Sequence, residues 1–338
     1  MERRNFLKTA VSAGLALAGT NLPASGQGGK SAGDYDAKGL PTTMFGSTGV
    51  RIPRIVLGLG SRFCHIDTDE EAYEMLNYAL DNGFYYWDTA HTYDNTIALP
   101  SWKAKPKELV ISEVRVGEVV KTRRREIFLS TKVQAREPSE AMKQIELSLK
   151  RLNTDRLDML KIHGVETIDD VNRMSQKGNL MDMVMRMKAE KVTRFIGFSC
   201  HSGAEAAKEM MTRAPFDSMI IAMNHYPPHQ NRQEIAVPAA KEKKMGILLM
   251  KAVRPRETVA GLQAADLVKY ALSLDGPDAL VLGMDSVHVV KSNLDILRHF
   301  QKLPTKRMQE LAVSLAPFYR HENLPWMQKG YTDGNWKC

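Results

Sequence analysis

Short apolar runs alternate with longer amphipathic segments along the chain from about residue 50 onward. The apolar runs, which predict strands, are 55–58, 85–87, 127–131, 157–162, 195–198, 218–222, 246–250 and 279–282. Helical periodicity occurs between them, at 69–82, 109–121, 138–152, 168–190, 202–213, 234–244, 261–273 and 287–300. Eight strands that alternate with eight helices predict an α/β fold with a parallel sheet.

A closed (β/α)8 TIM barrel fits this alternation better than an open, doubly wound sheet does. The pattern runs for roughly 250 residues without a long break, which is the usual length of a single barrel. No GxGxxG motif follows the first predicted strand, and this counts against a dinucleotide-binding Rossmann fold. We therefore expect one barrel and no internal linker.

The first thirty residues have the pattern of an export signal. Arg3 and Arg4 precede an apolar run at 11–18, which is too short to span a bilayer. This arrangement is typical of a twin-arginine signal peptide. An amphipathic N-terminal helix is the alternative. We expect residues 1–30 to be signal peptide and leader, read by the twin-arginine export machinery, and the protein to be periplasmic or extracellular.

Composition and charge narrow the possible partners. Hydrophobic residues make up 43% and charged residues 25% of 338 residues, as in ordinary globular proteins. The net charge of +8 lies mostly in segments 1–30 and 302–338. The central part of the chain is therefore close to neutral, and this charge distribution does not predict nucleic-acid binding. No cysteine follows the apolar run, so we expect no stable membrane anchor. The three cysteines lack zinc-ligand spacing, and we predict no metal site.

Polar residues stand where several of the predicted strands end. They are Asp88, Tyr93 in the following loop, Lys132, His163, the run Ser199, Cys200 and His201, and Asn224. Active sites of barrels of this kind lie at the carboxyl ends of the strands. We therefore expect these side chains to meet at one mouth of the barrel. The alternatives are a structural Asp88–Lys132 ion pair, a packed loop tyrosine and a core histidine.

An acid, a phenol, an amine and an imidazole together suit the reduction of a carbonyl group. A phenol with a pKa near 10 is a poor proton donor at neutral pH. A nearby ammonium group favours the phenolate, and a carboxylate keeps that ammonium charged and oriented. The histidine can donate a hydrogen bond to the substrate oxygen. The hydride must then come from a bound nicotinamide.

Several sequence blocks resemble the aldo/keto reductase family. Residues 83–93 (GFYYWDTAHTY) resemble the block around its catalytic Asp and Tyr, and 125–133 (REIFLSTKV) the block that ends in its catalytic Lys. Residues 147–163 (LSLKRLNTDRLDMLKIH) are similar to the block that ends in its catalytic His. Residues 195–199 (FIGFS) and 282–286 (LGMDS) match its cofactor-binding blocks more loosely.

The resemblance implies a role for each matching residue. Tyr93 would be the proton donor, Lys132 would tune it, Asp88 would pair with Lys132, and His163 would orient the carbonyl. The cofactor, NADP or NAD, would be bound by Ser199, Cys200, Lys251, Arg254 and Asn293. The barrel would extend over 40–303 with a β-hairpin at 42–53, and 304–338 would be a C-terminal helical extension.

Departures from the family pattern leave two other functions open. Cys200 replaces an Asn, Ile220 a Gln, and Val289 an Arg that often binds the 2′-phosphate of NADP. The four catalytic positions are intact, so the sequence still predicts a carbonyl reductase for a small-molecule substrate, an aldehyde, ketone or sugar. A cofactor-binding regulatory or low-turnover module is one alternative. A sugar oxidoreductase with a tightly retained nicotinamide cofactor is the other.

Overall fold

The protein is described by a computed structural model over residues 35–96, 108–223, 232–257, 259–319 and 324. Its centre is a closed barrel of eight strands in the order β10-β3-β4-β5-β6-β7-β8-β9, and all of its strand pairs are parallel. The strands are β3 (Ile55–Gly58), β4 (Tyr86–Asp88), β5 (Phe128–Val133), β6 (Leu157–Ile162), β7 (Thr193–Cys200), β8 (Ser218–Ala222), β9 (Gly246–Met250) and β10 (Ala279–Gly283). The predicted (β/α)8 barrel is confirmed.

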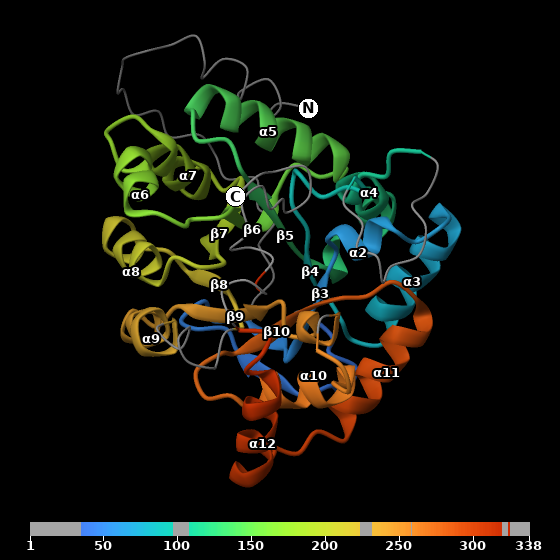
Figure 1. Ribbon diagram of the computed structural model, residues 1–338. Coiled ribbons are helices and arrows are strands. Elements are labelled where there is room, and N and C mark those ends of the chain that lie inside the picture. The colour runs from blue at the N-terminus through green and yellow to red at the C-terminus, as the bar shows by residue number, and fades with distance from the viewer. Residues whose placement is uncertain (1–34, 97–107, 224–231, 258, 320–323, 325–338) are drawn as a thin grey trace.

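Helices surround the barrel on its outer side (Figure 1). They are α2 (Ser61–Cys64), α3 (Asp69–Asp81), α4 (Ser112–Arg123), α5 (Pro138–Arg151), α6 (Ile168–Met174), α7 (Leu180–Ala189), α8 (Ala204–Arg213), α9 (Val237–Glu242), α10 (Ala264–Ser273) and α11 (Val287–Arg298). The C-terminal extension contributes α12 (Thr305–Leu315), whose Arg307 forms an ion pair with Asp266 of α10. Among the described residues no helix is long and apolar enough to cross a membrane.

The predicted helix at 168–190 is wrong as a single element. The Thr167 hydroxyl caps the start of α6, and the Asn179 side chain caps the start of α7. Gly178 between them has φ +80, a backbone conformation that favours glycine. The helical periodicity of the sequence extends across this turn, and for that reason it predicted one helix where the structure has two. The helices predicted to begin at 109, 202 and 261 begin at 112, 204 and 264. Where one helix was predicted at 234–244, a π-helical turn at Arg232–Ala236 comes first and α9 follows it.

A short hairpin closes the amino-terminal end of the barrel. Its strands β1 (Thr42–Met44) and β2 (Arg51–Pro53) pair antiparallel, as expected for 42–53. The connecting turn inserts the fully buried Phe45 ring against the Tyr86 ring of β4, with ring centroids 5.8 Å apart. A Cβ atom at Gly246 would overlap the Phe45 ring, so glycine is required there. The barrel interior is thereby sealed at the end opposite the loops that follow the strands.

Strand register places alternate side chains inside the barrel at matching heights. Asp88 is paired with Ser130, and Lys132 with Lys161. Side chains two residues apart on one strand point to the same face, so Tyr86 lies below Asp88 and Ser130 below Lys132. The carboxyl ends of β4, β5 and β6 therefore carry a polar interior layer, while the lower interior is aromatic and apolar.

Candidate active site at the carboxyl ends of the strands

The Lys132 ammonium group contacts both Asp88 and Tyr93 of the predicted site. Its Nζ lies 2.6 Å from Asp88 Oδ2, donates to the Thr89 carbonyl at 2.8 Å and lies 3.2 Å from the Tyr93 hydroxyl. Asp88 and Lys132 are 3% and 2% exposed, whereas Tyr93 is 9% exposed. The pair is therefore buried beneath the phenol, and of these three side chains Tyr93 lies nearest to solvent.

His163 completes the group from the next strand. It directly follows β6, where its amide donates to the Val133 carbonyl. Its imidazole meets the Tyr93 ring edge-on, with ring centroids 5.6 Å apart. The four residues that sequence analysis selected thus lie together, contributed by the ends of three adjacent strands and one loop.

A second lysine, which sequence analysis missed, contacts Asp88 from the other side. Lys161 of β6 is fully buried, and its Nζ donates to Asp88 Oδ1 at 2.9 Å and to the Tyr86 hydroxyl at 3.1 Å. It also contacts Ser130 Oγ, which is itself 3.1 Å from Asp88 Oδ1. The signal that could have revealed it is spacing, because Lys161 stands two residues before His163 and so shares its face of the strand.

Burial and opposite charges determine how this cluster ionises. Burial alone would raise the pKa of Asp88, but the ammonium groups of Lys132 and Lys161 outweigh it and lower the pKa to about 2. Burial lowers the pKa of Lys161 to about 8, with Asp88 opposing that effect and Lys132 adding to it. Asp88 is therefore ionised at neutral pH. Of Asp88 and Lys161, Lys161 is the group that loses its charge more easily near neutral pH.

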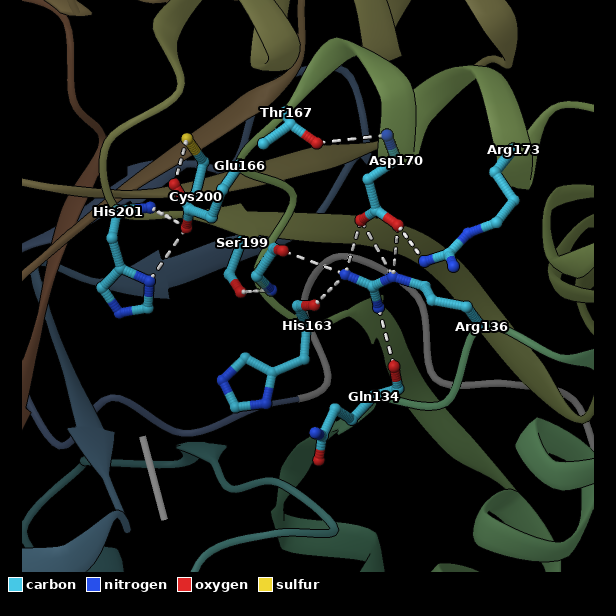
Figure 2. A network of polar contacts seen from close by, with 11 residues as sticks. Gln134, Arg136, His163, Glu166, Thr167, Asp170, Arg173, Ser199, Cys200 and His201 are labelled. Atoms are coloured by element: carbon cyan, nitrogen blue, oxygen red, sulfur yellow. Dashed lines mark hydrogen bonds and ion pairs between the residues drawn. The ribbon is translucent and has the colours of Figure 1, made fainter. Parts of the chain in front are cut away.

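The predicted cofactor residues come from three parts of the barrel. Ser199 and Cys200 end β7 (Figure 2). Ser199 Oγ accepts the Gly164 amide at 2.9 Å, and Cys200 Sγ lies 3.3 Å from the Gly203 carbonyl. Lys251 follows β9 with φ +64, and Arg254 begins the short 3-10 turn after it. Asn293 is buried on α11. Ser199 thus contacts the backbone beside His163, and the cofactor-binding roles of all five residues stay predictions.

A family comparison decides the classification. The sequence profile of the Aldo/keto reductase family matches residues 54–255, which include the four clustered residues. This chain belongs to the aldo/keto reductase family. The expectation drawn from its sequence blocks is confirmed at that level.

Curated relatives of this aldo/keto reductase match over part of their length. An uncharacterized oxidoreductase, YrpG of Bacillus subtilis, is 30% identical over 142 residues, which are 37% of this chain and 40% of the relative. Glycerol 2-dehydrogenase (NADP(+)) of Saccharomyces cerevisiae is 29% identical over 126 residues, which are 36% of this chain and 33% of the relative. The chain thus spans 40% or less of the length of these relatives.

Solved aldo-keto reductase structures have the same fold. The holo form of AKR11C1 from Bacillus halodurans superimposes with a TM-score of 0.64 at 20% identity, covering 81% of this chain and 96% of that one. An aldo-keto reductase from Klebsiella pneumoniae in complex with NADPH gives a TM-score of 0.64 at 19% identity, covering 83% and 97%. These likenesses establish the barrel architecture.

Arg136, also missed from sequence, fixes the backbone at His163 in this aldo/keto reductase. Its guanidinium donates to the His163 and Gly164 carbonyls at 2.8 and 2.9 Å, and its Nε forms a bond of 2.9 Å to Asp170 (Figure 2). Charge-assisted bonds of this kind are stronger than neutral ones. Arg136 therefore connects the loop after β5 to the end of β6 and the first turn of α6.

Glu166 organises the loop after β7. Its carboxylate accepts the amides of His201, Ser202 and Gly203 at 2.6, 2.7 and 3.1 Å. Burial would raise the pKa of Glu166, but its hydrogen bonds and His201 lower it to about 2. Cys200 Sγ lies 3.7 Å from Glu166 Oε2 and His201 Nδ1 lies 3.1 Å from Oε1, so these adjacent side chains reach one carboxylate where β7 ends.

Some of the sequence predictions fall on residues that the structure does not describe. The export signal at 1–30, Asn224 and the tail from 325, including Cys338, lie outside the described residues. Within the described residues no group of three or more His, Cys, Asp or Glu side chains is arranged to bind a metal ion.

Proposed function

We propose that this protein is an NAD(P)H-dependent oxidoreductase that reduces a carbonyl group, with Tyr93 as the proton donor. The observation that carries the proposal is the Lys132 ammonium group, which contacts both the Asp88 carboxylate and the Tyr93 hydroxyl inside the barrel mouth. A structural ion pair explains the first contact but gives no reason for the second. Membership of the aldo/keto reductase family supports the same chemistry.

The four residues divide the proton chemistry among them. Tyr93 holds a proton at its hydroxyl oxygen and transfers it to the substrate carbonyl oxygen. The Lys132 charge, 3.2 Å away, stabilises the phenolate that remains. Asp88 keeps that ammonium in place, and the His163 imidazole beside the Tyr93 ring orients the carbonyl. Burial of the pair strengthens its electrostatic effect on the phenol.

The donor set around the mouth fits a nicotinamide dinucleotide, NADP or NAD. Ser199 offers a hydroxyl for the carboxamide, and Cys200 follows it with its thiol against Glu166 and the Gly203 carbonyl. Lys251 and Arg254 offer cations for phosphates, and Asn293 an amide for the adenine end. When bound, this cofactor supplies the hydride. The yeast relative is named for its use of NADP(+), and the Klebsiella structure is a complex with NADPH. Val289 stands where the family often has an Arg for the 2′-phosphate, so we propose use of either nucleotide.

We further propose that the protein is exported. The Arg3-Arg4 pair and the apolar run at 11–18 support a twin-arginine signal and leader within 1–30. The barrel domain would then be 40–303, followed by an extension at 304–338. The twin-arginine machinery, which transports folded proteins, would be its partner, and a periplasmic or extracellular location its destination. A small carbonyl compound is the proposed substrate.

Tyr93→Phe tests the proton-donor role. We expect kcat for reduction of a test aldehyde to fall about a hundredfold or more, because general acid catalysis contributes roughly 10²–10⁴ to such rates. Oxidation of NADPH and NADH measures the rate, and fluorescence titration measures nucleotide binding, which should change less than about twofold. The control is Tyr73→Phe, because the Tyr73 hydroxyl lies on α3 and contacts an exposed carboxylate, Asp69, at 3.4 Å.

The outcomes separate the candidate functions. Nucleotide binding and turnover in the wild type, both kept in Tyr73→Phe, with turnover lost in Tyr93→Phe, support the proposal. A Tyr93→Phe variant that keeps more than a tenth of the rate refutes the proton-donor role. Nucleotide binding without turnover in the wild type would instead favour the low-turnover module.

A further inference from the structure

Two ammonium groups share one carboxylate in the barrel interior. Asp88 Oδ2 is held by Lys132, and Asp88 Oδ1 by Lys161. A single lysine would already neutralise Asp88 and contact Tyr93. The second lysine adds a buried positive charge that the proton chemistry described above does not use.

The surroundings of Lys161 contain no further charge among the described contacts. Tyr86 and Asp88 face it from β4, Ser130 and Lys132 from β5, and Gly197, its register partner on β7, brings no charged side chain. Burial raises the pKa of the Tyr86 phenol well above its ordinary value, so this phenol stays neutral. With both lysines protonated, the cluster therefore carries a net charge of +1.

Aromatic rings lie below the cluster, and Tyr93 lies at its other end. Beneath Lys161 lie the fully buried Tyr86 ring and the Phe45 ring of the hairpin. Hydrogen bonds run from the Tyr86 hydroxyl through Lys161, Asp88 and Lys132 to the Tyr93 hydroxyl. A charge at Lys161 thus acts through a poorly screened interior on the phenol at the other end.

We propose that Lys161 is a positioning residue for carbonyl reduction, which holds Asp88 opposite Lys132 and whose positive charge favours the phenolate that Tyr93 becomes on giving up its proton. This inference rests on the proposed function and deepens it. It also predicts a dependence on pH. Loss of the Lys161 proton takes the cluster from a net charge of +1 to zero and removes support from the phenolate.

The sign of the pH effect follows from the ionisation of the cluster. Asp88 stays ionised and Tyr86 neutral across the range from pH 6 to 9, whereas the pKa of Lys161 is about 8. Below pH 8 Lys161 is charged and reduction is fast. As pH rises through 8 the charge is lost and kcat falls.

The experiment compares wild type, Lys161→Met, Lys161→Gln and the control Lys188→Met in steady-state reduction of a test aldehyde from pH 6 to 10. Lys188 forms an ion pair of 2.6 Å with Asp217, against 2.9 Å for Lys161 and Asp88, and lies outside the cluster. At pH 7 we expect kcat of both Lys161 variants to fall on the order of tenfold, the ratio that corresponds to one pKa unit at the phenol. The decline of kcat near pH 8 should disappear from both variants, while their KM and nucleotide affinity should stay within about twofold of the wild-type values.

Each outcome distinguishes this inference from the proposed function. If Lys161→Met and Lys161→Gln retain the wild-type rate and the wild-type decline near pH 8, the inference is overturned while the proposed function stands. If the wild type turns over without any decline near pH 8, the inference is overturned even where both variants fail to fold. If the folded wild type binds nucleotide but reduces no aldehyde, the proposed function falls and the inference with it.

Discussion

Lys161→Met is expected to make the protein more stable at neutral pH. Removal of a buried charged group that is hydrogen-bonded usually destabilises a protein. Here the reverse is expected, because Asp88 keeps Lys132 as its counter-ion at 2.6 Å when Lys161 is gone. Methionine has a similar length and no charge, so it fills the space without the burial penalty.

The magnitude follows from the two pKa values of Lys161. Its pKa is about 8 in the folded protein against 10.5 for an ordinary lysine, so keeping it charged at pH 7 costs the fold about 3 kcal/mol. The lost hydrogen bonds to Tyr86 and Asp88 offset about 1–2 kcal/mol of that gain. The net expectation is a stabilisation of about 1–2 kcal/mol at pH 7.

The pH dependence supplies a sharper test. A lysine with a lowered pKa in the folded state destabilises the fold below that pKa, and the penalty fades as pH rises toward the unfolded value. Between pH 7 and pH 9 the advantage of Lys161→Met over wild type should therefore shrink by about 1 kcal/mol. Groups outside the cluster of Asp88, Lys132, Lys161 and Tyr93 titrate alike in both proteins and cancel in the difference.

Urea unfolding at pH 7 and pH 9, followed by circular dichroism, measures both quantities from midpoints and slopes. Lys132→Met serves as the contrast, because it removes the bonds of Nζ to Asp88 and Thr89 and should destabilise the fold at both pH values. The reasoning is refuted if Lys161→Met is less stable than wild type by about 1 kcal/mol or more at pH 7. It is equally refuted if the difference between the two proteins does not change with pH.

Two further predictions concern other parts of the chain. Arg136→Leu removes the hydrogen bonds to Asp170 and the His163 carbonyl and should lower stability by about 2–3 kcal/mol. The fall in kcat should exceed any change in nucleotide affinity. Urea unfolding measures the stability and steady-state kinetics the rate, and an unchanged kcat would contradict the role of Arg136 in fixing His163. Changing both Arg3 and Arg4 to Lys should retain the protein in the cytoplasm, measured by cell fractionation, and undiminished export would refute the twin-arginine signal.

The barrel and the four clustered residues were predictable because both depend on simple periodicity. Alternating apolar runs and amphipathic segments specify strand and helix order, and a parallel barrel brings every strand end to one mouth. Lys161 is harder to recognise, because it stands within 157–162, which the sequence predicts as an apolar strand. The period of two along a strand places it on the same face as His163, and a lysine on that inward face needs a counter-charge.

The supporting contacts were not predictable in this way. Arg136 reaches the His163 carbonyl across 27 residues of chain, and Glu166 reaches the His201 amide across 35. Both lie in loops that follow strands, where the sequence has no regular period to place a side chain. Their partners are backbone groups, which every residue possesses, so no residue type marks the other half of the contact.

The cost of Lys161 to stability and its proposed effect on the reaction have one physical cause. Water that would solvate the ammonium group is excluded by Tyr86, Phe45 and the strand walls, so the charge is expensive to keep. The same exclusion leaves its field unscreened at Tyr93. If Lys161→Met proves both more stable and slower, the two effects come from a single buried charge. If it proves more stable with an unchanged rate, the field of Lys161 does not reach the phenol, and Lys132 alone supports the phenolate.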